Sequence, residues 1–378
     1  MSRNAIALTN LVQWNEAGEA RSAHWRSESG VAPPRRVIVC DDRITADAAY
    51  RLACEGTAML WRGDFQNARQ LLQALARRLE RTRRKPAATP AEAFHLHRQA
   101  QSQRARTLGM LLVPVEADHR LDLRRAPDLR QACTEAYGPA GEGYVASLRE
   151  LLGLIGAYEW RKKGIEIAAL EGRIHPHYGV FAPIRNEYVG LVAEAPLPSK
   201  ALAFDIGTGT GVLAAVLARR GVLNIVATDH DPRALACARE NLVRLGLITR
   251  VDVVQADLFP AGRAPLVVCN PPWLPARPSS PLEHAVYDQE SRMLRGFLDG
   301  LAVHLEPDGE GWLILSDLAE HLGLRPRAEL LAAFDKAQLQ LLGRMDVRPN
   351  HPRVYESADP LHAARAAEIT SLWRLRAR

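Results

Sequence analysis

The chain has 378 residues, 47% of them hydrophobic and 24% charged, which is the composition of a globular protein long enough for two domains. It contains no run of about 18 apolar residues and its start, MSRNAIALTN, lacks a signal-peptide pattern, so we expect a cytoplasmic protein without membrane association. Its five cysteines are scattered without any C-x-x-C pair, which argues against a disulfide framework and against zinc, and we predict no metal site.

The net charge of +6 and the pI of about 9.2 suit an acidic partner such as RNA or a ribosome, although arginine-rich composition can also reflect genome bias. A basic run from Arg77 to Lys85 follows an amphipathic helix that we predict over residues 67–80. This run is the best candidate contact for a polyanion in the N-terminal half. A solvated helix end is the alternative, because cations also suit a helix C-terminus.

The first 165 residues show few patterns that carry chemistry. We predict a strand over residues 36–40, a helix over 46–54, and a mostly helical stretch from 91 to 164 that a strand at 110–115 interrupts. We therefore expect residues 1–165 to form an α-rich substrate-recognition domain of unassigned fold, and residues 166–378 to form a second domain.

The segment ALAFDIGTGTG opens the second domain. Its apolar run ends at Asp205, three glycines follow at Gly207, Gly209 and Gly211, and a helical pattern comes next. A strand, a glycine turn and a helix N-terminus together form a nucleotide-sized site, because glycines allow close backbone approach and the helix supplies free N–H groups. A dinucleotide fingerprint would need a third glycine where Val212 stands.

This segment resembles motif I of the class I S-adenosylmethionine-dependent methyltransferases. The resemblance implies that Asp205, Gly207, Gly209 and Gly211 bind S-adenosyl-L-methionine, and that the domain has a Rossmann-like, doubly wound, seven-stranded α/β sheet. The βα alternation that follows agrees with it, since the pattern predicts strands over residues 223–228, 250–255, 265–269 and 311–316 and an antiparallel pair over 340–347 and 369–376.

If the strand that leads into motif I is counted as the first, acidic residues follow the second strand (223–228) and the third strand (250–255). Asp229 stands where an acid receives a ribose in a nucleoside-binding βαβ unit, and we prefer it to Asp231, which could cap the next helix instead. In the resembled family the position after the third strand contacts the adenine. The resemblance therefore assigns Asp257 and Leu258 to cofactor binding.

The fourth strand ends in Asn270-Pro271-Pro272-Trp273. This resembles the (N/D)-P-P-(Y/F/W) motif of methyltransferases that modify a nitrogen conjugated to a π system. Such a nitrogen is a poor nucleophile, so acceptors must hold its N–H groups and steer its lone pair. We assign this role to the Asn270 side-chain oxygen and to the Pro271 carbonyl, which the prolines preorganise, and we predict that Trp273 stacks on the planar target.

The stretch HPHYGVFAPIRNEYVGLVAEA, ahead of motif I, is similar to the corresponding stretch of release-factor glutamine methyltransferases. Pro183, Arg185 and Glu187 match that family's Pro-Arg and acidic positions, with Ile184 interrupting the pair. We assign Arg185 to substrate binding. The combined motifs are also similar to those of small-domain rRNA methyltransferases.

The sequence thus predicts an S-adenosylmethionine-dependent N-methyltransferase that acts on a translation-related macromolecule. The segment ahead of motif I favours a glutamine amide in a protein, whereas the basic run favours an amino group of a base in rRNA or tRNA. A small-molecule acceptor is also open, although the extra domain favours a macromolecule, and a non-catalytic, methyltransferase-like binding module is a further alternative.

Overall fold

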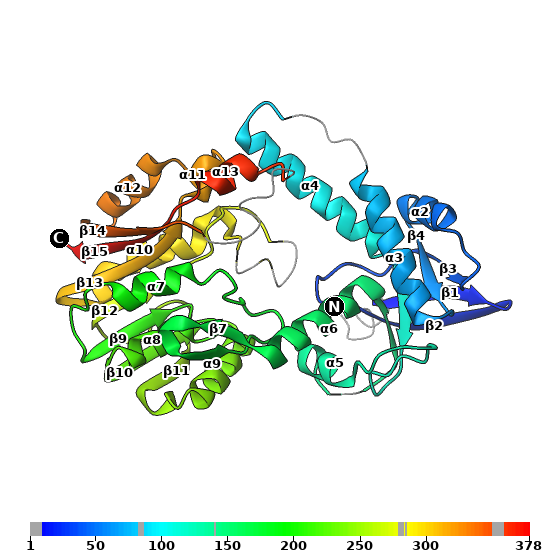
Figure 1. Cartoon of the computed structure of the whole chain (residues 1–378), viewed down its shortest axis with the longest axis horizontal. Helices are drawn as coiled ribbons and strands as arrows, with labels where there is room; N and C mark the ends of the chain where they lie inside the picture. The colour runs from blue at the N-terminus through cyan, green and yellow to red at the C-terminus, as the bar shows by residue number, and fades with distance from the viewer. Residues whose placement is uncertain (1–9, 82–86, 140, 279–282, 284–285, 350–358) are drawn as a thin grey trace, which may run out of the picture. The chain divides into compact units, whose positions relative to one another are not determined.

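The structure is a computed structural model, and it describes residues 10–81, 87–139, 141–278, 283, 286–349 and 359–378. The chain divides into two compact units (Figure 1). The N-terminal unit holds Met1–Pro86 and Leu96–Glu159, and the C-terminal unit holds Ala87–His95 and Trp160–Arg378. Two helices, α4 (Pro90–Leu108) and α6 (Leu148–Lys163), begin in one unit and end in the other.

The N-terminal unit is built on a six-stranded mixed sheet with the order β1-β2-β6-β5-β4-β3. Its strands are β1 (Leu11–Glu16), β2 (Glu19–Arg26), β3 (Arg36–Cys40), β4 (Thr57–Trp61), β5 (Leu111–Val115) and β6 (Tyr144–Ser147). Its other helices are α2 (Ala46–Cys54), α3 (Phe65–Glu80) and α5 (Arg130–Tyr137). The sequence patterns identified β3 and β5, whereas the other four strands emerge only in the structure.

The C-terminal unit contains a seven-stranded sheet with the order β11-β10-β9-β12-β13-β15-β14. Its strands are β9 (Leu202–Ile206), β10 (Asn224–Asp229), β11 (Val251–Gln255), β12 (Ala264–Cys269), β13 (Leu305–Ser316), β14 (Leu339–Val347) and β15 (Thr370–Ala377). Strands β9 to β13 pair in parallel, and β15 runs antiparallel to both β13 and β14. This topology confirms the predicted Rossmann-like, doubly wound fold with its terminal antiparallel pair.

Helices follow most of these strands, as a doubly wound sheet requires. They are α7 (Glu187–Glu194), α8 (Val212–Arg219), α9 (Pro232–Arg244), α10 (Arg292–His304), α11 (Leu318–His321), α12 (Arg327–Lys336) and α13 (His362–Ala367), with short 3₁₀ turns at Ala168–Leu170, Ile248–Arg250 and Gln289–Ser291. A two-stranded hairpin, β7 (Ile165–Ile167) and β8 (Gly172–Ile174), precedes α7, and the turn at Ala168–Leu170 lies between its strands.

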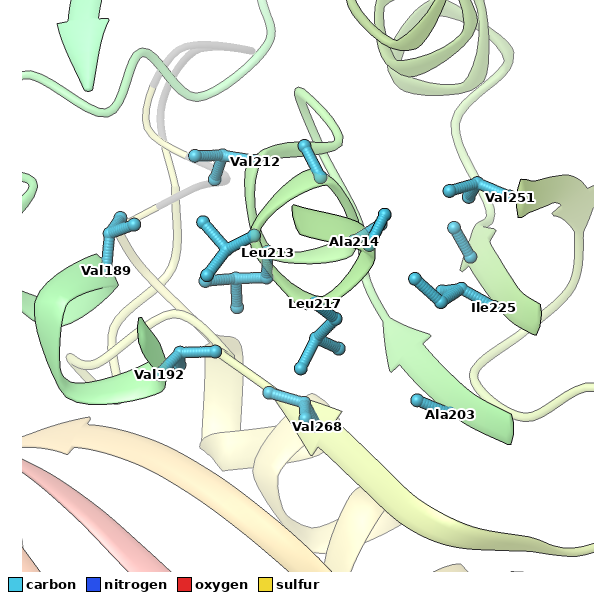
Figure 2. Close-up of a cluster of buried hydrophobic side chains, with 14 of the residues drawn as sticks. Val189, Val192, Ala203, Val212, Leu213, Ala214, Leu217, Ile225, Val251 and Val268 are labelled. Carbon is cyan, nitrogen blue, oxygen red and sulfur yellow. The ribbon is translucent and has the colours of Figure 1, made fainter. Parts of the chain in front are cut away.

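Alternate residues of the central strands face two separate hydrophobic clusters, one on each side of the sheet. Figure 2 shows the cluster around α8, in which Leu213 and Leu217 lie among Val189 and Val192 of α7 and Val268 of β12. The helix α8 is apolar all round and its residues Val212 to Ala218 are all buried. It is therefore a central helix, which fixes where its N-terminus and the preceding glycine turn lie.

Residues 87–95 belong to the C-terminal unit because Phe94, in the first turns of α4, is buried in a cluster with Leu274, Leu318, Leu322 and Leu361. Among the described residues, no helix combines the length and the apolar character that crossing a membrane requires. Within the same residues, no three His, Cys, Asp or Glu side chains are grouped as metal ligands would be.

Candidate functional site

Apart from Arg185, which precedes α7, the predicted site residues lie at or just beyond the carboxyl ends of four adjacent parallel strands. The last residues of β9 and β12 are paired, Ile206 with Cys269, so Gly207 and Asn270 are the next residues on neighbouring strands. Strand β10 lies on the other side of β9, and Asp229 at its end pairs with the last residue of β11. The fold therefore brings the glycine turn, both strand-end acids and NPPW to one edge of the sheet, where doubly wound folds bind ligands.

Asp205 lies near the end of β9, just before the glycine turn, and its side chain is buried. Its Oδ2 accepts the Thr208 hydroxyl at 2.7 Å and the Ala214 backbone N–H at 3.0 Å. Burial raises the pKa of the Asp205 carboxyl from 3.8 to about 6, and the two hydrogen bonds partly offset that effect. Asp205 therefore shapes the turn and caps the start of α8.

The three glycines of the turn all have positive φ angles, 70° for Gly207, 55° for Gly209 and 80° for Gly211. Other residues rarely adopt this left-handed backbone. A Cβ at Gly211 would also lie 3.2 Å from Ala238 in α9, whereas a Cβ at Gly209 would meet no atom within 4 Å. The turn is thus packed against α9 at its end and open at its middle glycine.

Asp229 ties the end of β10 to the glycine turn. Its Oδ2 accepts the Gly209 N–H at 3.0 Å, and its Oδ1 accepts the Asp231 N–H at 3.0 Å. Asp231 instead caps α9, because its side chain accepts the Arg233 N–H at 2.8 Å. Each carboxylate oxygen has two lone pairs, so Asp229 retains acceptor capacity for a ligand hydroxyl.

The residues after β11 differ in exposure. Asp257 is exposed and forms an ion pair with Arg292 at 3.3 Å. Leu258 is half-buried with a φ of 76°, and its carbonyl accepts the Thr228 hydroxyl at 2.5 Å. A Cβ at Gly296 of α10 would lie 2.6 Å from the Leu258 side chain, so the absence of a side chain at 296 lets α10 approach the end of β11.

The NPPW turn carries an internal hydrogen bond. The indole N–H of Trp273 donates to Oδ1 of Asn270 at 2.9 Å. Pro271 is buried, while Asn270 and Trp273 are half-buried. The backbone is anchored further along, because Leu274 donates its N–H to Val286 at 3.1 Å and accepts the Asp288 N–H at 2.8 Å. The Asp288 carboxylate in turn caps α10 by accepting the N–H groups of Met293 and Leu294.

Arg185 stands beside this turn with its donors already engaged. Its Nη1 and Nη2 donate to the two oxygens of Glu368 at 3.2 and 3.0 Å, and its Nε donates to Glu187 at 3.1 Å. Its guanidinium carbon lies 5.4 Å from the centroid of the Trp273 ring. Its assignment to substrate binding stays a prediction, and the structure gives it partners within the protein.

The sequence patterns did not identify two residues that contact the site, Tyr188 and Glu368. Tyr188 is buried next to Asn270 and has a pKa raised mainly by burial. Its ring meets that of Trp273 edge-on, with centroids 6.5 Å apart. Glu368 is 2% exposed and lies far away in sequence, just before β15, so no local pattern pointed to it.

Residues 172–339 match a family model described as "Methyltransferase small domain". The release factor glutamine methyltransferase of Cereibacter sphaeroides is 32% identical over 178 residues, which cover 43% of this chain and 63% of that protein, less than two thirds of its length. The tRNA1(Val) (adenine(37)-N6)-methyltransferase of Shewanella amazonensis is 28% identical over 183 residues, which cover 44% of this chain and 78% of that protein. A solved structure of ribosomal protein L11 methylase from Lactobacillus delbrueckii subsp. bulgaricus matches with a TM-score of 0.38 and 18% identity, covering 55% of this chain and 87% of that one.

The family match confirms the predicted resemblance, and it lies on the part of the chain that forms most of the seven-stranded sheet. The matched segment of the C-terminal unit is similar to methyltransferases of the class I type. S-adenosylmethionine, the predicted cofactor, is the methyl donor of that class.

Proposed function

We propose that this chain is an S-adenosylmethionine-dependent N-methyltransferase that acts on a planar nitrogen of a translation-related macromolecule. The observation that carries the proposal is the place of NPPW. It follows β12, the neighbour of the strand that carries the glycine turn, so an acceptor held at Asn270 lies next to that turn.

The residues at the glycine turn fit the cofactor. Gly209 leaves open space where a side chain would stand, and the Asp229 carboxylate beside it keeps acceptor capacity for ribose hydroxyls. Gly207, Gly209, Asp229 and Leu258 would hold the cofactor. When bound, it supplies an electrophilic methyl group on a sulfonium.

The chain's own contribution is to bind and orient the acceptor. Asn270 Oδ1 and the Pro271 carbonyl accept the N–H groups of the planar nitrogen, which directs its lone pair towards the methyl group. Trp273 provides an aromatic surface against the flat acceptor. Placing the nitrogen and the methyl carbon in line removes the entropic cost of their encounter.

A glutamine side-chain amide in a translation protein is our first choice of acceptor. The segment from His175 to Ala195 is similar to the corresponding segment of release-factor glutamine methyltransferases, and a protein of that name matches this chain at 32% identity. A primary amide has the two N–H groups and the conjugated lone pair that the NPPW acceptors suit.

The exocyclic amino group of an RNA base is the second candidate, and the distribution of charge favours it. The N-terminal unit contains 23 lysine and arginine residues against 17 aspartate and glutamate residues, whereas the C-terminal unit contains 26 of each. The whole net charge of +6 therefore belongs to the N-terminal unit. Excess positive charge outside the catalytic unit suits contact with phosphates.

The test is to incubate the purified full chain with tritiated S-adenosylmethionine and cell extract, and then to treat the labelled macromolecules with protease or with ribonuclease. Label released by protease identifies a protein acceptor, and label released by ribonuclease identifies RNA. Asn270→Ala is the negative variant, and Asn224→Ala, an exposed asparagine at the opposite end of β10, is its matched control. Absence of label above the Asn270→Ala background would contradict the proposed function and favour a non-catalytic binding module.

A further inference from the structure

The Trp273 indole is held by groups that lie outside the NPPW motif. The Arg185 guanidinium lies against its ring at 5.4 Å from the centroid, and the Tyr188 ring meets it at 90°. At the ring's polar atom, the N–H donates to Asn270. The ring is thus fixed by a cation, an aromatic edge and a hydrogen bond, which restrict both its position and its rotation.

Arg185 is itself held by carboxylates. Glu368 receives two hydrogen bonds from it, and the planar fork of an arginine matches the two carboxylate oxygens in a single geometry. Glu368 is 2% exposed, and its Oε1 also accepts the Ser316 hydroxyl at 2.6 Å. Because this acid is buried and anchored, it fixes the place of the guanidinium beside Trp273.

The hydrogen bond from Trp273 determines which way the Asn270 amide faces. An indole N–H can only donate, so the amide must present its oxygen to Trp273. If the amide turned over, two donors would face each other and the hydrogen bond would be lost. The same oxygen has a second lone pair, which is the acceptor that the proposed reaction needs.

We propose that Arg185 and Glu368 are positioning residues, which hold the Trp273 indole so that its N–H keeps the Asn270 oxygen turned towards the methyl acceptor. The effect on methyl transfer rests on the proposed function, whereas the positioning of the Trp273 indole rests on the side-chain contacts alone. Arg185 acts through Trp273, and Glu368 acts through Arg185.

The arrangement is tested on the full chain without any acceptor, by recording the indole N–H signals of ¹⁵N-labelled protein. The chain has seven tryptophans, and Trp273→Phe identifies the signal of Trp273. In Arg185→Gln and in Glu368→Gln we expect this signal to shift upfield and its exchange with solvent to speed up by about fivefold, because the hydrogen bond is weakened. Asn270→Ala, which removes the acceptor, should shift the signal in the same direction.

Arg344 offers a matched control within the same unit. Its guanidinium lies 5.0 Å from the Trp373 ring and pairs with Asp346 at 2.7 Å. Arg344→Gln should therefore move the Trp373 signal and leave the Trp273 signal in place. If the Trp273 signal keeps its position and exchange rate in folded Arg185→Gln and Glu368→Gln proteins, the positioning role is overturned. Should Arg185→Gln fail to fold, Glu368→Gln alone decides the question.

The effect of these residues on methyl transfer is measured with the acceptor fraction that the tritium experiment labels. Trp273→Phe keeps an aromatic ring but loses the five-membered ring that carries the N–H, so we expect kcat to fall about tenfold with KM changed less than about twofold. Arg185→Gln should behave alike, and Arg185→Lys should recover part of the rate because the cation remains. An unchanged kcat in Trp273→Phe overturns the catalytic part. If the wild-type chain labels nothing, the proposed function fails, while the indole signals still decide the positioning.

Discussion

The carboxylate of Asp229 accepts the backbone N–H of Gly209 at 3.0 Å, and this contact joins the end of β10 to the middle of the glycine turn. The two residues are 20 positions apart, and the parallel pairing of β9 with β10 brings them together. An anionic acceptor on a glycine N–H makes a strong hydrogen bond. Asp229 therefore organises the turn in addition to the ligand contact that we propose for it.

We predict that Asp229→Ala weakens binding of S-adenosylhomocysteine by about 10- to 100-fold, because hydrogen bonds to a charged group contribute about 1.5–3 kcal/mol. Isothermal titration calorimetry measures this. Asp252→Ala, an exposed aspartate within β11, is the control and should bind as the wild type does. Equal affinities of the Asp229→Ala and wild-type chains would remove Asp229 from the site.

Asn270→Ala should keep the affinity for S-adenosylhomocysteine within about threefold and reduce methyl transfer by about 100-fold or more, the effect of removing one preorganised transition-state contact. Calorimetry and tritium transfer measure the two quantities on the same preparation. The Asn224→Ala control should change neither. Substantial transfer by Asn270→Ala would exclude the planar-nitrogen mechanism.

The buried Asp205 predicts a pH dependence of stability. Its pKa is about 6 in the folded protein against 3.8 for the ordinary group, so the folded state binds the proton more tightly than the unfolded state. The stabilising contribution is therefore complete below about pH 4 and is lost as the pH rises through about 6. Asp205→Asn cannot titrate, so the stability difference between it and the wild type should change across this interval.

Urea unfolding of both proteins at a series of pH values measures that difference. The change from pH 4 to pH 7 should amount to about 3 kcal/mol, which is what two pKa units represent. Other titrating groups are common to both proteins and cancel in the comparison. A difference that stays constant over this range would show that folding does not raise the pKa of Asp205.

If RNA is the acceptor, the basic run that begins at Arg77 should contact its phosphates. Residues 82–86 of this run lie outside the described part of the structure, so the prediction rests on the sequence for them. Replacing Arg81, Arg83 and Arg84 by glutamate should weaken binding of bulk tRNA and lower the slope of log K against log salt by about one per lost phosphate contact. Reversal of Arg219, Arg263 and Arg295, three exposed arginines of the C-terminal unit, controls for net charge. An unchanged slope in the Arg81–Arg84 variant would favour a protein acceptor.

The core beneath the glycine turn should be sensitive to cavities. Leu217 is fully buried in the cluster of Figure 2, so Leu217→Ala should lower the free energy of unfolding by about 2–5 kcal/mol. Leu223, 61% exposed just after α8, is the matched control, and its replacement by alanine should stay within about 0.5 kcal/mol. Denaturant unfolding at neutral pH compares the two. Similar losses in both would mean that α8 is not the packed centre of the unit.

The sequence could predict the C-terminal sheet because the signals there are local. Strands β9, β10 and β12 are short apolar runs that lead into the glycine turn, an acid and NPPW, and helical patterns follow β9 and β10, so β9 to β12 could be located closely. In the N-terminal sheet, such patterns identified only β3 and β5. Strand β2 is largely exposed, β1 has a single buried residue, and β6 has only four residues, so local patterns do not mark them as strands.

The residue types of the site, the glycine turn, the strand-end acids and NPPW, could all be read from the chain itself, because each is defined by neighbours within a few positions. Tertiary structure alone decided how they are oriented. It placed Glu368 against Arg185 from 183 positions away, directed the Trp273 N–H at Asn270, and enclosed Asp205 inside the turn. Side-chain orientation and burial depend on how the surrounding segments pack, even for neighbours such as Asn270 and Trp273, and the spacing of residue types along the sequence does not specify that packing.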